Sequence, residues 1–171
     1  MSEDRQQLTS NEFDEFEFRR ALSHFCTGVA VITACTEVGS PVGLAVQSFA
    51  SISMDPPLIS FAPALTSLSW PTIRERTRFC VNVLAAGQEE LSRRFASSGG
   101  DKFDGVDWSR SPLGNPVLNG SLSWLDCEIH AEHGAGDHTL VLGRVVGLHA
   151  TEGEPLVYFR KRYRWLSADV Y

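Results

Sequence analysis

Three polar segments of the chain contain residue types that could bind a small anionic or aromatic ligand. Residues 47–53 carry a glutamine and three serines at the expected end of a strand, where hydroxyls and backbone N–H groups could hold a phosphate or a flat heterocycle, or simply face water. Asn82 interrupts an apolar run, so if it is buried its amide needs partners from a ligand or a neighbouring strand. Lys102, in a loop rich in Gly and Ser, could neutralise a phosphate or be solvated.

A cluster of carboxylates and imidazoles invites a metal hypothesis; its members are Glu128, His130, Glu132, His133, Asp137 and His138. The alternation of a strand would place Glu128, His130 and Glu132 on one face and His133 on the other. We therefore predict no metal site. His138 directly follows the glycine-containing turn at residues 134–136, and we interpret it as a residue at the rim of a pocket.

Several catalytic signatures are absent from the sequence. It has no G-x-G-x-x-G, no Walker A lysine loop, no G-x-S-x-G elbow and no H-E-x-x-H. The nearest approach to a dinucleotide fingerprint is residues 134–139, where a threonine replaces the third glycine. A dinucleotide used by this chain is therefore not expected to lie on a Rossmann turn.

The composition indicates an ordinary globular chain rich in β-structure. Of its 171 residues 43% are hydrophobic and 21% charged, with 14 Gly and 10% aromatic residues. The net charge of −6 argues against nucleic-acid binding, and no apolar run approaches the ~18 residues of a membrane span. The N-terminus lacks a signal-peptide pattern, so we expect a cytoplasmic protein. Without a C-x-x-C pair, buried and reduced thiols are expected at Cys26, Cys35, Cys80 and Cys127.

The elements that must position these residues are mostly short strands. Residues 1–11 are expected to be a flexible segment, followed by a single domain over residues 12–171. An amphipathic helix is predicted over residues 12–25, capped by Ser10 or Asn11. Two further helices are predicted, one from Trp70 and one over residues 88–95. Residues 160–164 are expected to be a solvated basic tail. Strands are predicted at residues 29–34, 42–49, 51–54, 58–62, 79–84, 122–132, 139–148 and 156–159. This spacing favours a barrel or sandwich.

Taken in order, several segments resemble the flavin reductase family, which supplies reduced flavin to two-component monooxygenases. The resemblance extends over about residues 16–163 and is carried by FCTGVAVIT at 25–33, GLAVQSF at 43–49, SMDPPL at 53–58, FCVNVL at 79–84, DKF at 101–103, GDH at 136–138 and YFR at 158–160.

The resemblance implies a mainly β protein with a few helices, folded as a split β-barrel and homodimeric. It implies that FMN or FAD binds at the dimer interface, that NADH or NADPH supplies a hydride, and that a separate oxygenase receives the reduced flavin. Because these cofactors carry the chemistry, the protein need only orient them and stabilise developing charge. A flavin- or haem-binding carrier or sensor, and a self-contained flavoenzyme, are the alternatives.

The resemblance also assigns roles to particular residues. His138 would lie at the nicotinamide side as the catalytic residue, with Arg160 close by. Thr66 and Leu68 occupy positions near Ser67 where many relatives place a basic residue, which implies weaker phosphate binding here. The implied flavin-binding residues are Ala45, Val46, Gln47, Ser48, Ala50 and Ser51 along the ring and phosphate, Ser67 near the phosphate, Asn82 near the ring or ribityl chain, and Lys102 and Phe103 near the phosphate or adenine end.

Overall fold

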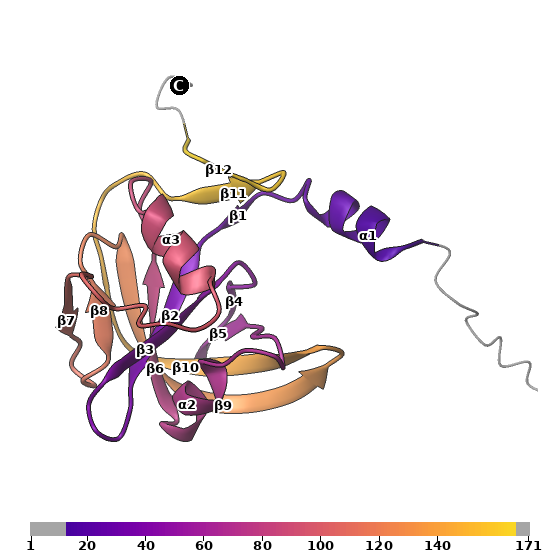
Figure 1. Cartoon of the computed structure of the whole chain (residues 1–171). Coiled ribbons are helices and arrows are strands. Elements are labelled where there is room, and N and C mark those ends of the chain that lie inside the picture. The colour runs from indigo at the N-terminus through magenta and orange to yellow at the C-terminus, as the bar shows by residue number, and fades with distance from the viewer. Residues whose placement is uncertain (1–12, 167–171) are drawn as a thin grey trace, which may run out of the picture.

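The computed structural model describes residues 13–166. The predicted flexible segment at residues 1–11 lies outside this range, and so do the predicted helix caps Ser10 and Asn11. Three helices and twelve strands make up the described part (Figure 1): α1 (Glu15–Leu22), α2 (Trp70–Glu75), α3 (Glu89–Ala96), β1 (Thr27–Gly28), β2 (Ala30–Cys35), β3 (Pro41–Val46), β4 (Ala50–Met54), β5 (Pro57–Phe61), β6 (Arg78–Val83), β7 (Trp108–Arg110), β8 (Pro116–Leu118), β9 (Ser123–Ala135), β10 (His138–Ala150), β11 (Val157–Phe159) and β12 (Arg162–Arg164).

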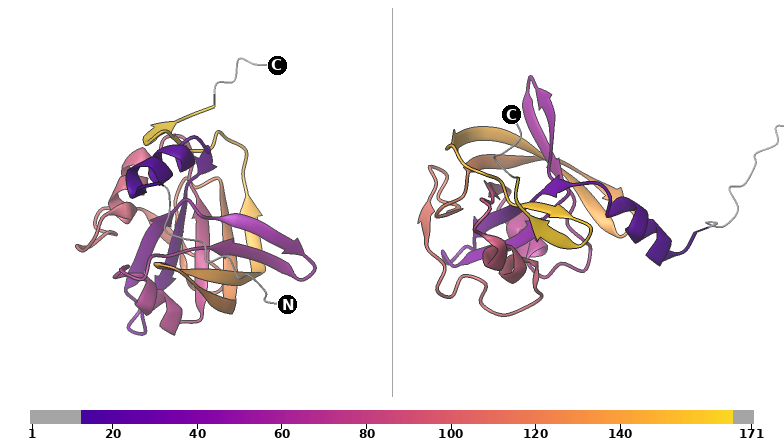
Figure 2. Two further views of the ribbon diagram at one scale, coloured as in Figure 1. Left: turned by 90° about the vertical axis from the view of Figure 1, so that its right-hand side faces the viewer. Right: turned by 90° about the horizontal axis from the view of Figure 1, so that it is seen from above.

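Seven strands form one antiparallel sheet in the order β3-β2-β6-β9-β10-β5-β4. Its two edge strands, β3 and β4, follow one another in the chain and are joined only by residues 47–49. A link this short keeps the ends of the two edges close together, so the sheet curls strongly (Figures 1 and 2). The mainly β prediction is therefore confirmed.

The core lies on both faces of β2. Ile32 packs inside the curved sheet with Phe61 and Phe79, whereas Val31 packs on the outer face with Phe95 of α3. A strand covered on both faces shows a continuous apolar run rather than alternation, which explains the β-branched sequence of residues 29–34. Helix α3 and the loop that follows it are thereby fixed against the outside of the sheet.

Helix α1 forms as predicted but is shorter than residues 12–25. Asp14 caps it: its Oδ1 accepts from the Glu17 backbone N–H at 2.7 Å, and the Glu17 carboxylate accepts in return from the Asp14 N–H at 3.4 Å. The helix stands away from the sheet (Figure 1), and none of its residues is buried. The side chains of Phe18 and Leu22 are 49% and 57% exposed, so the described part of this chain covers its apolar face only partly, in part through the Phe13 ring that stacks on Phe18.

Two predictions about the chain are wrong. Residues 160–164 are not simply a solvated tail, because Arg162–Arg164 pair with β11 through a turn in which Arg160 and Lys161 adopt left-handed backbone conformations. Of the four free cysteines, Cys80 and Cys127 are buried, but Cys35 is half-buried and Cys26 is exposed. No described helix has the length and apolarity needed to cross a bilayer.

Candidate functional site

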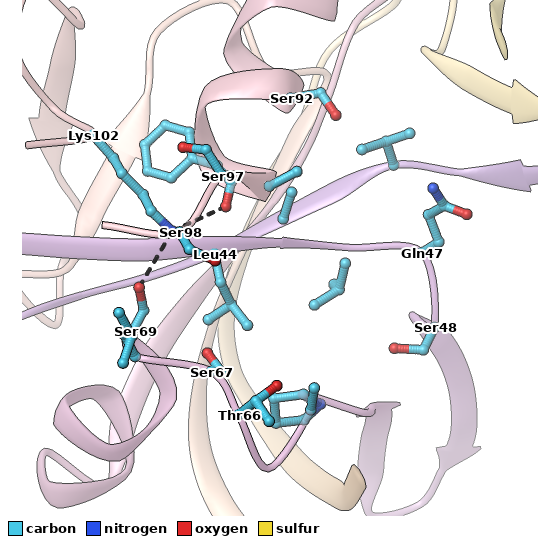
Figure 3. A pocket seen from close by; sticks show the side chains of 18 of the residues that line it. Leu44, Gln47, Ser48, Thr66, Ser67, Ser69, Ser92, Ser97, Ser98 and Lys102 are labelled. Atoms are coloured by element: carbon cyan, nitrogen blue, oxygen red, sulfur yellow. Dashed lines mark hydrogen bonds between the residues drawn. The ribbon is translucent and has the colours of Figure 1, made fainter. Parts of the chain in front are cut away.

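An open groove runs along the outer edge of β3 (Figure 3). Its volume is about 630 Å³, a size typical of small-molecule sites. The walls come from β3 and its link to β4, the segment between β5 and α2, the end of α3 with the following loop, and the start of β10. The lining residues are Val29, Leu44, Ala45, Val46, Gln47, Ser48, Ala62, Pro63, Ala64, Thr66, Ser67, Leu68, Ser69, Ser92, Phe95, Ala96, Ser97, Ser98, Gly99, Lys102, His138 and Tyr163.

Lys102 lies at one end of the groove, where Figure 3 shows it reaching toward Ser69. Its Nζ donates to the Phe95 carbonyl at 3.1 Å, the Gly43 carbonyl at 3.3 Å and Ser69 Oγ at 3.4 Å. All three acceptors are neutral, and among the described residues no carboxylate forms a salt bridge with it. Burial lowers the pKa of this ammonium. The arrangement suits an anionic ligand, which would supply the missing counter-charge.

Gln47 and Ser48 lie at the other end of the groove (Figure 3). Ser48 Oγ accepts from the Ala62 backbone N–H at 2.8 Å, which ties the β3–β4 link to the end of β5. His138 stands at the same end, with Nδ1 2.7 Å from Asp137 Oδ1. This hydrogen bond lowers the pKa of the Asp137 carboxyl. His138 is thus at a rim, as predicted, with its ring oriented by a neighbouring carboxylate.

Hydroxyl groups line the groove between its two ends. Ser67, which the resemblance places near the phosphate, is one of them, and its Oγ accepts from the Trp70 N–H at the start of α2. Thr66 and Ser69 flank it, and Ser97 and Ser98 come from the loop after α3. The sequence reasoning missed these last two serines and Ser69. The only signal for Ser97 and Ser98 was the Ser- and Gly-rich run directly before Lys102, and nothing local shows that this run lies beside β3. Ser69 lies outside that run.

Several predicted ligand residues lie outside the groove. Ala50 and Ser51 are exposed on β4, where they pair with β5, beyond the link that carries Ser48. Phe103 is buried beneath the loop, with its ring centroid 5.0 Å from that of Phe95. Arg160 is exposed in the β11–β12 turn, and its guanidinium lies 5.2 Å from the centre of the Phe159 ring.

Asn82 also lies outside the groove, because the core uses its amide. The residue is completely buried on β6. Its Nδ2 lies 3.0 Å from Thr33 Oγ1 and 3.3 Å from the Val31 carbonyl, and its Oδ1 accepts from the Leu118 N–H at 2.8 Å. The sequence left open whether a ligand or a neighbouring strand supplies the partners of the Asn82 amide. In the structure they come from neighbouring strands.

The lining defines what the groove can do. Small and apolar residues of β3 and the segment after β5 offer a surface for a flat ring, while hydroxyls and Lys102 suit a phosphate. Among the described lining residues Lys102 is the one Lys, Arg, Asp or Glu. Residues 13–166 contain no group of three or more His, Cys, Asp or Glu arranged to hold a metal ion. These features favour binding and orienting reactants over nucleophilic attack by the protein.

Comparison with known proteins gives a consistent picture. The sequence profile described as "Flavin reductase like domain" matches residues 22–167. The chain is 45% identical over 163 residues to the protein named flavin-dependent monooxygenase, reductase subunit HsaB, of Rhodococcus jostii (strain RHA1), covering 95% of this chain and 83% of that one.

Two solved structures are also similar along most of the chain. The nitrilotriacetate monooxygenase component B homologue from Mycobacterium thermoresistibile has a TM-score of 0.87 and 46% identity, covering 90% of this chain and 87% of the other. The Streptomyces globisporus C-1027 NADH:FAD oxidoreductase SgcE6, solved in complex with NAD and FAD fragments, has a TM-score of 0.86 and 34% identity, covering 91% and 94%.

Proposed function

The chain belongs to the flavin reductase-like family, and we propose from this membership and from its groove that it is an NAD(P)H:flavin oxidoreductase. In this role it accepts FMN or FAD and a reduced nicotinamide dinucleotide, and it passes the reduced flavin to a separate oxygenase. The observation that carries the proposal is Lys102, a partly desolvated cation with only neutral partners, at the end of a groove lined by hydroxyls. A flavin phosphate would supply the missing negative charge.

Other groove residues would position the two reactants and stabilise the charge that develops during hydride transfer. The flavin, when bound, supplies the hydride acceptor. Ala45 and Val46 of β3 and Ala62 beyond β5 leave room for a ring to lie flat against backbone, and backbone N–H groups can stabilise charge that develops on it. His138, at the far end from Lys102, is placed to orient the nicotinamide. The protein's contribution is then proximity and orientation of two reactants.

The finer features of this proposal are a split β-barrel, a homodimer and a cytoplasmic location. The curled sheet with adjacent edge strands β3 and β4 supports the split barrel. The half-exposed apolar face of α1, including Phe18 and Leu22, supports a second copy as its cover. Four free cysteines are consistent with a reducing compartment.

A turnover assay tests the function. The purified protein is mixed with NADH or NADPH and with FMN or FAD under air, and the loss of the reduced nicotinamide absorbance is followed. We expect loss that requires added flavin and continues over many turnovers, because air reoxidises the released flavin. No flavin-dependent loss with either nicotinamide would refute the proposal, and tightly retained flavin without turnover would indicate a carrier or sensor instead.

A further inference from the structure

The hairpin formed by β11 and β12 is a local positive patch on an acidic chain. Its two strands are joined by a two-residue turn, and it carries the cations Arg160, Lys161, Arg162 and Arg164. All four residues are exposed, and residues 156–166 contain no Asp or Glu. None of the four forms a salt bridge within the described part of the chain. The patch therefore stands alone against a net charge of −6.

The turn of the hairpin holds its two cations in a strained backbone. Arg160 and Lys161 have φ angles of 49° and 62°, so both lie in the left-handed region. Two-residue turns of this kind favour Asn-Gly, Asp-Gly or Gly-Gly, because most side chains strain this region. Strain that persists in a folded chain points to a function of the residues that bear it. Here those residues bring two positive charges to the tip of the hairpin.

The hairpin borders two openings of the site. Tyr163 lines the groove, and its hydroxyl lies 2.9 Å from Ser92 Oγ of α3, which fixes β12 at the groove wall. Arg162 and Arg164 flank Tyr163 on β12 but line neither the groove nor the cavity beside α1. Lys161 lines that second cavity, which shares residues with the groove. The charges thus surround the openings at a range over which the field is not fully screened, ~8–10 Å at ordinary ionic strength.

Resting on the proposed function, we propose that the β11–β12 hairpin steers phosphate-bearing cofactors electrostatically toward the groove. A chain of net charge −6 repels anionic flavins and nicotinamide dinucleotides at long range, and the groove itself offers Lys102 alone as a Lys or Arg. A positive patch at an opening raises the local concentration of anions and speeds their association by about 10–10³-fold. Arg160 therefore contributes through its field, although it lies outside the groove.

Association rates of FMN and riboflavin test this proposal, because riboflavin lacks the phosphate and its charge. They are measured by stopped-flow quenching of flavin fluorescence at about 0.01 M and about 1 M ionic strength, where the Debye length is roughly 30 Å and 3 Å. The double variant Arg162→Gln, Arg164→Gln removes two charges that line neither cavity. Arg76→Glu is the control: it changes the net charge equally at an exposed residue directly after α2, at the opposite end of the molecule (Figures 1 and 2).

We expect the wild type and Arg76→Glu to bind FMN about tenfold faster than riboflavin at the lower ionic strength, and both flavins at similar rates at the higher one. The double variant should bind FMN about threefold more slowly or worse at the lower ionic strength, with riboflavin unchanged within about twofold. Equal salt dependence of the two flavins in the wild type, or equal FMN rates for the double variant and Arg76→Glu, would overturn the proposal. Unchanged FMN association with lost retention on heparin would overturn it in favour of an anionic macromolecule.

Lys161→Gly separates the charge of the turn from its strain. Glycine adopts a positive φ freely, so this variant should have a higher Tm but a slower FMN association at the lower ionic strength. Thr77→Gly is its match, because Thr77 is exposed, uncharged and has a φ of 54°, so only the Tm should rise. FMN association as fast in Lys161→Gly as in Thr77→Gly would contradict the proposal. NADH oxidation at saturating FMN reports on the proposed function separately and should be unchanged in the double variant.

Discussion

Asn82 shows how a polar residue in an apolar strand can serve the fold rather than a ligand. Its Oδ1 is the partner of the Leu118 backbone N–H at 2.8 Å, inside the core. Asn82→Ala removes that partner, and an unsatisfied buried donor costs about 1–3 kcal/mol. We therefore expect the free energy of unfolding in urea to fall by about that amount, while the folded variant binds flavin as the wild type does.

Asn119→Ala is the matched control, because Asn119 is exposed in the turn beside Leu118. Its effect on stability should stay within about 0.5 kcal/mol. An Asn82→Ala variant that is as stable as the wild type but binds flavin much more weakly would return Asn82 to the ligand site.

His138 belongs to the rim of two cavities. It lines the groove and also a cavity of about 930 Å³ beside α1, where Asp137 and Gln47 accompany it. Lys102 does not line this second cavity, so under the proposed function a contact made by His138 would serve the nicotinamide rather than a flavin phosphate at Lys102. We expect His138→Ala to raise KM for NADH about tenfold, the equivalent of one lost polar contact, and to change the flavin dissociation constant less than about twofold.

Steady-state kinetics and a flavin titration check this prediction, with His133→Ala as control. His133 is exposed on β9 and does not line the groove. Unchanged constants for both ligands in His138→Ala would remove His138 from the site.

Lys102 and Phe103 are neighbours in the sequence but lie in different surroundings, and this difference shows how far the sequence can predict single ligand-binding residues. The DKF motif drew attention to both, but only Lys102 lines the groove, since Phe103 packs into the core. A motif indicates which segment is near the ligand, whereas the direction of each side chain depends on packing against distant residues such as Phe95. For the same reason Ser97 and Ser98 could not be found from their own neighbourhood.

At the scale of elements, the groove depends on a close approach between α3 and β3. A Cβ built on Gly43 would lie 2.8 Å from Phe95 Cε1 and 3.0 Å from the Ile32 carbonyl oxygen. Gly43→Ala must therefore push α3 away from the sheet, and overpacking of this kind costs about 1–3 kcal/mol. Because the Gly43 carbonyl also accepts from Lys102, we expect flavin binding to weaken together with the stability.

Gly87→Ala provides the comparison, because a Cβ there would meet nothing within 4 Å and α3 begins only two residues later. Thermal unfolding and flavin titration of both variants test the prediction. Equal stabilities for Gly43→Ala and Gly87→Ala would show that α3 adapts freely and does not fix the groove.

Eight of the twelve strands were predicted, because each of these carries a local signal, whereas the two- and three-residue strands β1, β7, β8 and β12 were missed. The β-branched run of β2, the turn at residues 39–41 and the proline-bounded β5 all reveal themselves within a few residues. β12 was missed because its charged sequence has no apolar pattern, and it is held by pairing with β11 and by the contact between Tyr163 and Tyr158, whose ring centroids lie 5.1 Å apart. Tertiary contacts override local pattern in such short strands.

At the scale of the whole molecule, the sheet order β3-β2-β6-β9-β10-β5-β4 joins segments that are far apart in sequence. His138 reaches the groove only because β10 pairs with β5, and Lys102 only because the loop after α3 returns to β3. Composition and periodicity contain no information about such pairings. Strand spacing and composition predicted a mainly β fold, and the ordered motifs added the family, but neither showed which of the predicted site residues line the groove.

The half-exposed apolar face of α1 leads to a prediction about assembly. Two-fold assembly uses the same patch on both copies, so a change in it acts twice. Phe18 and Leu22 are about half exposed in one chain, so covering the exposed half of each is worth about half of the ~1.5–3 kcal/mol gained on burying a whole side chain of this kind. We expect the protein to sediment at twice its mass of 18.9 kDa at micromolar concentration. The double variant Phe18→Asp, Leu22→Asp should raise the dimer dissociation constant by about a hundredfold or more.

Arg20→Ala is the control for that experiment, because position 20 lies on the opposite side of the helix from positions 18 and 22. Sedimentation velocity over a dilution series measures the dissociation constants, and far-ultraviolet circular dichroism verifies that the variants keep their secondary structure. A wild type that sediments as a single chain, or a double variant that still dimerises as tightly as Arg20→Ala, would show that α1 is not the dimer contact. Helix α1 borders the cavity that His138 shares with the groove. Loss of the dimer contact at α1 should therefore also weaken flavin binding by the double variant.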